Sequence, residues 1–280
     1  MMPIQFANAS VQVFESALYR TTTTVLQTPD LVLVVDPNWL PEEVYTIRRY
    51  VTQIRGERPL YLLFTHADYD HIVGYRAFPE ATVIASEYLA TRPDRQALLQ
   101  QVRDWDERRY IIRDYPLAYP EVDIVAQHDG QVLQIGGTRL AFWLAPGHTP
   151  DGLFTIVSWA GANIWLPGDY LSNIEFPFIT HSSKAYEATL HKIKAALPGW
   201  SAQSLLVPGH GDVTTAAEEV LQRIQEAANY IQQLRATVQS GQPFDIEALW
   251  QRYAFRKGME AEHTRNLDLM RREYAAAQAS

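Results

Sequence analysis

Short apolar runs separated by turn residues occupy the first two-thirds of the chain. The runs at 19–28 and 31–37 flank Pro29-Asp30, a pattern that predicts a hairpin. Residues 59–66 and 81–87 are brief, apolar and β-rich, which is typical of strands, and similar runs resume from residue 131. We therefore expect the strands to lie before residue 212, where the pattern changes.

Helical spacing of apolar residues marks other segments. Beyond residue 212 the apolar positions follow four- and three-residue steps until Gly241 and Pro243 end the pattern. Thr215, with Glu218 three residues later, predicts a capped start for this long helix. The other segments expected to be helical are 40–56, 93–109, 184–197, 245–256 and 258–277.

The order of these elements indicates one layered fold. No linker rich in Pro, Gly or Ser divides the chain, and no segment repeats. Strands mixed with helices, followed by a helical tail, predict an α/β or α+β architecture. We expect a first domain over residues 1–215 and a C-terminal helical extension over 216–280 that packs on the same domain.

Several predicted strands end in a histidine or an aspartate. Two His and two Asp fall within the six residues of the run HADYDH, where they would repel or desolvate one another without a cation. Imidazole and carboxylate ligands suit Zn, Fe or Mn, so the pattern predicts a metal site. The residues concerned are His66, Asp68, Asp70, His71, His148, Asp169 and His210.

Composition narrows the class of protein further. The chain has 280 residues, a formal net charge of -8 and no cysteine. The absence of cysteine excludes disulfides, thiolate metal sites and a Cys nucleophile. The negative charge argues against a general nucleic-acid or anionic-membrane binder. Neither a signal peptide nor a membrane-spanning apolar run is evident, so we expect a cytoplasmic protein.

The ligand-bearing motifs resemble those of the metallo-β-lactamase superfamily, in its glyoxalase II-like branch of metal-dependent hydrolases. The matching stretches, in order, are VVDPNW, THADYDH, APGHTPDG, LPGDY and LVPGHGD, and the resemblance covers roughly residues 10–215. It implies a four-layer αβ/βα sandwich with a binuclear metal site along one edge of its two sheets. The helical C-terminal extension would follow this sandwich.

The resemblance also implies a role for each ligand. It assigns His66, Asp68 and His148 to a first metal, and Asp70, His71 and His210 to a second. Asp169 would bridge both metals, and Asp36 would support the ligand loop. Four other histidines match no ligand position: His128, His181, His191 and His263.

Asp68 departs from the usual family motif. That motif reads His-x-His-x-Asp-His, whereas this chain reads His-x-Asp-x-Asp-His. A third carboxylate weakens the Lewis acidity of the ions and favours Fe or Mn relative to an all-histidine zinc site. We expect two divalent transition metals per chain, zinc first, with iron or manganese as alternatives. An Asp68 that only hydrogen-bonds loop N–H groups is the structural alternative.

The resemblance implies a hydrolase. By position, the loops 108–120 and 170–183 are expected to form the pocket walls, and their aromatic residues indicate a partly apolar small-molecule substrate such as an ester, lactone, thioester or phosphoester. Asp70 would orient the attacking water and carry its proton. Tyr170 would contact substrate, or would be a packed aromatic residue. A di-iron redox enzyme, a sulfur dioxygenase with one iron, a tRNA-processing-type nuclease and an inactive binding protein are the alternatives. We expect no nucleic-acid or membrane partner, and a homodimer stays open.

Overall fold

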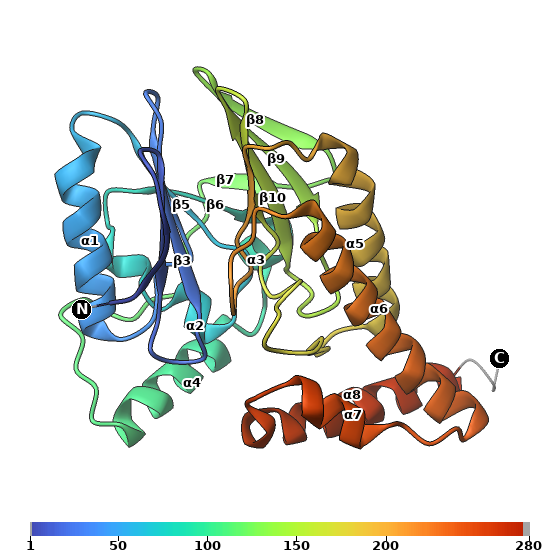
Figure 1. Cartoon of the computed structure of the whole chain (residues 1–280). Coiled ribbons are helices and arrows are strands. Elements are labelled where there is room, and N and C mark those ends of the chain that lie inside the picture. The colour runs from blue at the N-terminus through green and yellow to red at the C-terminus, as the bar shows by residue number, and fades with distance from the viewer. Residues whose placement is uncertain (1, 277–280) are drawn as a thin grey trace.

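Two β-sheets packed face to face form the centre of the protein (Figure 1). The computed structural model describes residues 2–276. The first sheet has the strand order β1 (Ile4–Ala7), β2 (Val11–Glu15), β3 (Thr22–Gln27), β4 (Val32–Val35), β5 (Leu60–Leu63), β6 (Thr82–Ser86) and β7 (Ile124–Ala126). The second has the order β12 (Ser204–Leu206), β11 (Ala162–Leu166), β10 (Leu153–Trp159), β9 (Thr138–Leu144) and β8 (Gln131–Ile135).

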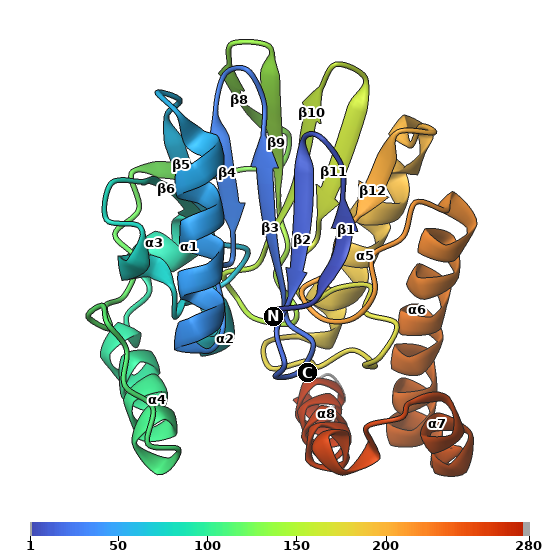
Figure 2. The same ribbon diagram turned by 60° about the vertical axis from the view of Figure 1, so that its left-hand side comes forward.

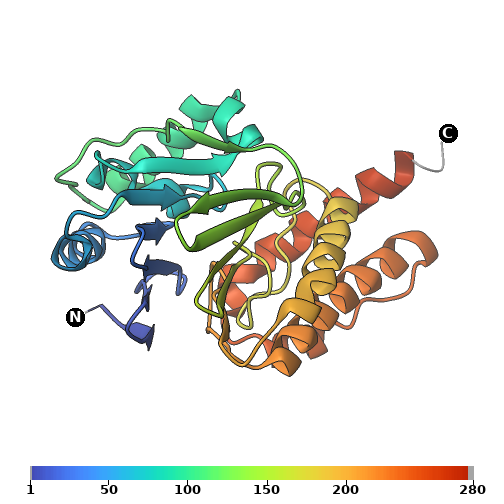
Figure 3. The ribbon, with the colours of Figure 1, turned by 90° about the horizontal axis from the view of Figure 1, so that it is seen from above.

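Helices cover the outer faces of both sheets. Figure 3, seen from above, shows α1 outside the first sheet and α5 and α6 outside the second. The helices are α1 (Pro41–Arg55), α2 (Tyr69–Ile72), α3 (Glu87–Thr91), α4 (Arg95–Arg108), α5 (Ser183–Ala196), α6 (Ala217–Ser240), α7 (Ile246–Arg252) and α8 (Arg256–Ala276).

Alternation along the strands separates the layers. In β4, Val32 and Val34 pack into the cluster that α1 covers, whereas Leu33 and Val35 pack between the two sheets. Successive side chains of a strand point to opposite faces, so a strand that is apolar on both faces is buried on both. The predicted four-layer αβ/βα sandwich is confirmed.

Strand direction brings the ligand-bearing loops to one edge. β4, β5 and β6 run parallel, as do β11 and β12 in the other sheet. The carboxyl ends of parallel strands meet at the same edge of a sheet, so the loops that follow them are neighbours. Figure 2 shows α4 and α8 below the sandwich, on either side of it.

The C-terminal helices pack on the second half of the sandwich. The long helix α6 contacts both α5 and α8, and its buried face includes Ile224 and Ile231. The capped start predicted at Thr215 is wrong. Thr214 still pairs with Leu206 in a β-bridge, so the chain stays extended there, and α6 starts after Ala216 without a side-chain cap.

The end of the chain follows the predicted order of helices. α8 starts two residues before the predicted helix at 258–277, whose last residue lies outside the described part of the chain. No helix within residues 2–276 combines the length and the apolar character needed to cross a membrane.

Candidate metal centre

Histidine and aspartate side chains from both sheets converge at one edge of the sandwich. His66 follows β5, His148 follows β9, Asp169 follows β11 and His210 follows β12. The short helix α2 carries Asp70 and His71, and Asp68 precedes it. All the predicted ligands are thus brought together, in three overlapping groups whose ligand atoms lie within 4.8 Å of one another: His66, Asp68 and His148; Asp70, His71 and His210; His66, His71 and Asp169.

The first group surrounds the carboxylate of Asp68. Its Oδ2 lies 3.3 Å from Nε2 of His148 and 3.7 Å from Nε2 of His66. On the other side of the same two imidazoles, Oδ2 of Asp169 lies 3.3 Å from His148 and 3.6 Å from His66. Asp68 makes no side-chain cap bond to α2. Its side chain therefore points into the site, as a ligand would.

The second group shares Asp169 with the first. Oδ1 of Asp169 lies 3.2 Å from Nε2 of His71, and Oδ2 lies 3.3 Å from Nε2 of His210. Oδ2 of Asp70 completes the group, 3.4 Å from Nε2 of His210 and 3.7 Å from Nε2 of His71. Asp169 is the one side chain that reaches all four imidazoles in these contacts, which is the placement of a bridging ligand.

The buried nitrogen atoms of the site fit a bound cation. Nε2 of His66, His71 and His148 and Oδ1 of Asp169 are buried without a hydrogen-bond partner. A buried polar atom without a partner is costly, and clusters of such atoms are rare unless a ligand satisfies them. Imidazole and carboxylate donors at these separations suit a divalent transition metal.

The other nitrogen of each imidazole is held by the protein. Nδ1 of His148 donates to the carbonyl oxygen of Phe178 at 2.7 Å, and Nδ1 of His210 donates to that of Tyr19 at 2.9 Å. A carbonyl can only accept, so Nδ1 keeps its proton, and when the imidazole is neutral the lone pair is on Nε2. That tautomer is the one a metal requires.

Asp36 fixes the other two imidazoles. Its Oδ2 accepts from Nδ1 of His71 at 2.9 Å and from Oγ1 of Thr65 at 2.6 Å. Since the Thr65 hydroxyl donates to Asp36, it accepts from Nδ1 of His66 at 3.0 Å. Asp36 has a φ of 48°, a strained conformation for a residue with a side chain. It therefore has the supporting position that the family resemblance implies.

Proton affinities in the cluster are strongly perturbed. Burial would lower the pKa of His71, His148 and His210, but the surrounding carboxylates outweigh it and raise each pKa well above its usual value. Burial and the neighbouring His71 instead lower the pKa of His66. Burial would raise the pKa of Asp169, but the histidines hold it well below its usual range. The cluster without metal is thus a set of mutually dependent ion pairs.

An ion pair between Arg92 and Asp151, which sequence reasoning missed, supports the loop that carries His66 and Asp68. Oδ2 of Asp151 accepts from the backbone N–H of Ala67 at 3.1 Å and from Nη1 of Arg92 at 2.8 Å. The Asp151 side chain is fully buried, and Ala67 separates the ligands His66 and Asp68. Asp151 thus anchors the backbone between two ligands. Its place in the GHTPDG motif was the only sequence signal.

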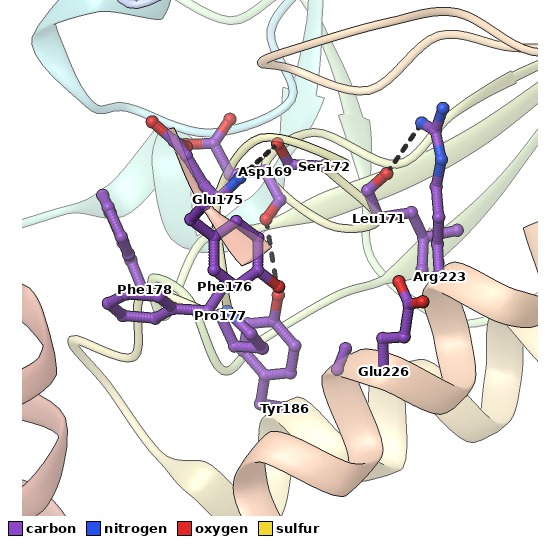
Figure 4. A pocket seen from close by; sticks show the side chains of 12 residues that line it. Asp169, Leu171, Ser172, Glu175, Phe176, Pro177, Phe178, Tyr186, Arg223 and Glu226 are labelled. Atoms are coloured by element: carbon purple, nitrogen blue, oxygen red, sulfur yellow. Dashed lines mark hydrogen bonds between the residues drawn. The ribbon is translucent and has the colours of Figure 1, made fainter. Parts of the chain in front are cut away.

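A pocket adjoins the site at Asp169 (Figure 4). Glu175 lines it, and burial, assisted by Asp169, raises the pKa of this carboxyl group. Sequence reasoning did not single out Glu175. The lining residues are Asp169, Leu171, Ser172, Glu175, Phe176, Pro177, Phe178, Tyr186, Arg223, Glu226, Ala227 and Tyr253. The segment 170–183 therefore forms one wall, and the C-terminal helices contribute another.

Tyr170 does not line this pocket. It is 2% exposed, and its ring packs against Tyr186 with 4.2 Å between centroids. Its hydroxyl accepts from the N–H of His148 at 3.2 Å and donates to the carbonyl oxygen of Pro146 at 2.9 Å. This is the position of a packed aromatic residue that holds the His148 loop.

The remaining histidines lie outside the ligand groups. His263 is buried on α8, where its Nδ1 lies 3.0 Å from the hydroxyl of Tyr230. His128 is exposed. The segment 108–120, expected from its position to form a second pocket wall, contributes no residue to the pocket beside Asp169.

A family model and several solved structures match the chain. The family model described as "Metallo-beta-lactamase superfamily" matches residues 18–231. Among solved structures, the chain is similar to a HARLDQ-motif mutant of a metallo-beta-lactamase from Cronobacter sakazakii. The identity is 24% and the TM-score 0.54, over 86% of this chain and 100% of the other.

Two other solved structures share the fold at lower identity. A metallo-beta-lactamase superfamily protein from Sulfolobus tokodaii is 16% identical with a TM-score of 0.53, over 78% of this chain and 86% of the other. A stereoselective inverting sec-alkylsulfatase from Pseudomonas sp. is 13% identical with a TM-score of 0.61, over 85% of this chain and 43% of the other. The present chain thus spans less than half of the alkylsulfatase.

Proposed function

The chain belongs to the metallo-β-lactamase superfamily, and from this premise we propose that it is a hydrolase in which two metal ions activate a water molecule. The observation that carries the proposal is the set of three buried Nε2 atoms, on His66, His71 and His148, that lack partners and face shared carboxylates. The β-lactamase and alkylsulfatase of similar fold are themselves hydrolases.

Two ligand sets meet at Asp169 in this proposal. When bound, the ions would supply Lewis acidity and lower the pKa of the attacking water. Zinc is the first choice, with iron or manganese as alternatives. One ion would be held by His66, Asp68 and His148, the other by Asp70, His71 and His210, with Asp169 common to both.

The protein's own side chains have distinct tasks in this reaction. We assign to Asp70 the orientation of the attacking water, whose proton its Oδ2 would then take. The carbonyl oxygens of Phe178 and Tyr19 keep the imidazoles of His148 and His210 in one tautomer. Asp36 does the same for His71. The site therefore needs little rearrangement before the substrate arrives.

The proposed substrate is a small ester, lactone, thioester or phosphoester. The pocket beside Asp169 combines the rings of Phe176, Phe178 and Tyr253 with the carboxyl group of Glu175. Asp169, Ser172, Arg223 and Glu226 add further polar groups, and a lining that mixes aromatic rings with polar groups suits small, partly apolar molecules. The net charge of -8 disfavours a nuclease. A cytoplasmic location belongs to the same proposal.

A di-iron redox enzyme is the second candidate, and one observation favours it. Oδ2 of Asp68 lies 3.7 Å from Nε2 of His66 and 3.3 Å from Nε2 of His148, which supports a role for this carboxylate as a ligand. Harder oxygen ligation shifts the preference toward iron or manganese. Reduction of oxygen or nitric oxide would then replace hydrolysis.

Metal analysis tests both candidates. We expect protein purified without added metal to contain close to two transition-metal ions per chain, and to hydrolyse members of a panel of esters, lactones, thioesters and phosphoesters. Chelation should abolish turnover, and zinc should restore it. A His128→Ala variant, changed at an exposed histidine, is the matched control. A colourless zinc protein would exclude the redox candidate, and protein that binds no metal even on reconstitution would overturn both.

A further inference from the structure

Asn266 of the C-terminal helix α8 hydrogen-bonds the backbone of the loop that carries Phe178, a residue that lines the pocket. Its Oδ1 accepts from the backbone N–H of Ile179 at 2.9 Å, and its Nδ2 donates to the carbonyl oxygen of Pro177 at 2.6 Å. One amide side chain thus satisfies the backbone on both sides of Phe178. Asn266 is 1% exposed, so both bonds are shielded from water.

The loop that Asn266 binds also orients a predicted metal ligand, His148. The carbonyl oxygen of Phe178 accepts the proton on Nδ1 of His148 at 2.7 Å. The next residue but one, Thr180, donates its backbone N–H to the carbonyl oxygen of His148 at 2.9 Å. Both the imidazole and the backbone carbonyl of His148 are therefore hydrogen-bonded to the segment that Asn266 fixes.

The amide of Asn266 is itself held in place. Its Nδ2 lies 3.0 Å from the hydroxyl of Tyr230 on α6, and that hydroxyl lies 3.0 Å from Nδ1 of His263 on α8. All three side chains are buried. A buried amide that hydrogen-bonds several groups has one favourable orientation. It therefore also fixes the position of the backbone groups that it binds.

We propose that Asn266 is a positioning residue for the metal centre, which it acts on through Phe178 and His148. The C-terminal extension then contributes to metal affinity although none of its residues is a ligand. The inference rests on the proposed metal-dependent function. Partners that orient a ligating histidine affect metal affinity by roughly 10- to 100-fold when they are removed.

A double-mutant cycle isolates this route from general destabilisation. Asn266→Ala is combined with His210→Ala, which leaves the first ligand group intact, and separately with His148→Ala, which removes the ligand that Asn266 would position. Zn²⁺ affinity is measured by competition with a chelator in each background. The control on the same helix is Asp268→Asn, whose side chain is exposed and pairs with Arg271.

We expect Asn266→Ala to weaken Zn²⁺ binding by up to about 10-fold in the His210→Ala background, the lower end of the range for direct partners, because Asn266 acts through Phe178. In the His148→Ala background it should have no effect, and Asp268→Asn should have none in either. Equal losses in both backgrounds would show a merely structural role, and unchanged affinity in both would equally overturn the inference. If Asn266→Ala does not fold, Tyr230→Phe, which removes one partner of the amide, should give a smaller loss with the same dependence on His148. Unchanged Zn²⁺ affinity in Tyr230→Phe would also overturn the inference.

The outcome for the wild-type protein separates this inference from the proposed function. Wild-type protein that binds no Zn²⁺ would overturn both. Wild-type protein that binds Zn²⁺, with Asn266→Ala variants that bind it equally well, would overturn the positioning role alone.

Discussion

Asp68 and His148 face each other across the first ligand group, with 3.3 Å between Oδ2 and Nε2. His148 comes from the second sheet, whereas Asp68 precedes α2 beside the first. The contact therefore joins the two halves of the sandwich at the site. Burial would raise the pKa of Asp68, but the positive charges of His66 and His148 lower it below its usual value. Asp68 is thus a carboxylate at neutral pH.

Replacing Asp68 tests whether it is a ligand. We expect Asp68→Ala to lose metal preferentially from the first group, because the second group keeps all its side chains. Asp68→His, which restores the usual family residue, should keep metal binding and some activity. The loss of one negative charge should increase the Lewis acidity of the metal, whereas the longer imidazole must fit a loop shaped for a carboxylate, so the two effects on activity oppose each other. Metal titration of both variants is the measurement, and unchanged affinity at both sites in Asp68→Ala would reduce Asp68 to a loop brace.

Removal of one histidine from each group tests the need for both. His148→Ala and His210→Ala should each abolish hydrolysis, since each removes an imidazole from one ligand set. The side chains lie at the edge of the sandwich and not among its core clusters, so unfolding should stay cooperative. His128→Ala is the control. Turnover at the wild-type rate in either ligand variant, measured beside its urea unfolding curve, would show that the metal is not catalytic.

The sequence predicted the candidate ligands from the apolar runs that precede them. His66, His148, Asp169 and His210 lie three or four residues after the ends of β5, β9, β11 and β12, and Asp68, Asp70 and His71 follow His66 in the loop and in α2. Short elements were harder. β1, β2 and β7 were not predicted, since none of them has an apolar run as long as that of β5, and they form here through pairing with neighbours.

Arg92, Asp151 and Asn266 were not predicted from the sequence, for a related reason. Arg92 meets Asp151 across 59 positions, and Asn266 meets Ile179 across 87. Neither contact leaves a pattern within one segment. The false cap at Thr215 shows the opposite error, in which a local motif was overridden by the pairing of Thr214 with Leu206. Only the assembled fold determines such contacts.

The buried pair of Arg92 and Asp151 predicts a large loss of stability on mutation. Arg92→Ala leaves the carboxylate of Asp151 buried without its cation. Breaking a buried pair on one side costs about 3–5 kcal/mol. The exposed pair of Arg256 and Glu260 gives the matched control, because Arg256→Ala should cost less than about 1 kcal/mol. Urea unfolding gives the free energy of unfolding of both variants. Equal losses in this free energy would mean that the buried pair contributes no more to stability than a surface pair.

The metal-free protein should lose stability as the pH rises. The pKa values of His71, His148 and His210 are raised in the folded protein, by carboxylates that outweigh the effect of burial. A raised pKa stabilises the folded state fully below the unfolded value of about 6.5. That contribution is lost as the pH rises through the folded pKa. His66 and His263, whose pKa values are lowered by burial, act in the opposite sense, two histidines against three.

Bound metal should oppose this loss of stability with rising pH. Comparison of the metal-free and the metal-loaded protein therefore tests the prediction. Metal must displace the protons from these histidines, so its affinity increases with pH. We expect the Tm of the chelated protein to fall between about pH 6.5 and 9, and the gap between the chelated and the Zn²⁺-loaded protein to widen. His148→Gln should flatten the slope of the chelated protein, because it removes one raised pKa, whereas His128→Ala should leave it unchanged. A chelated protein whose Tm rises over this range would contradict the ion pairs inferred for the site.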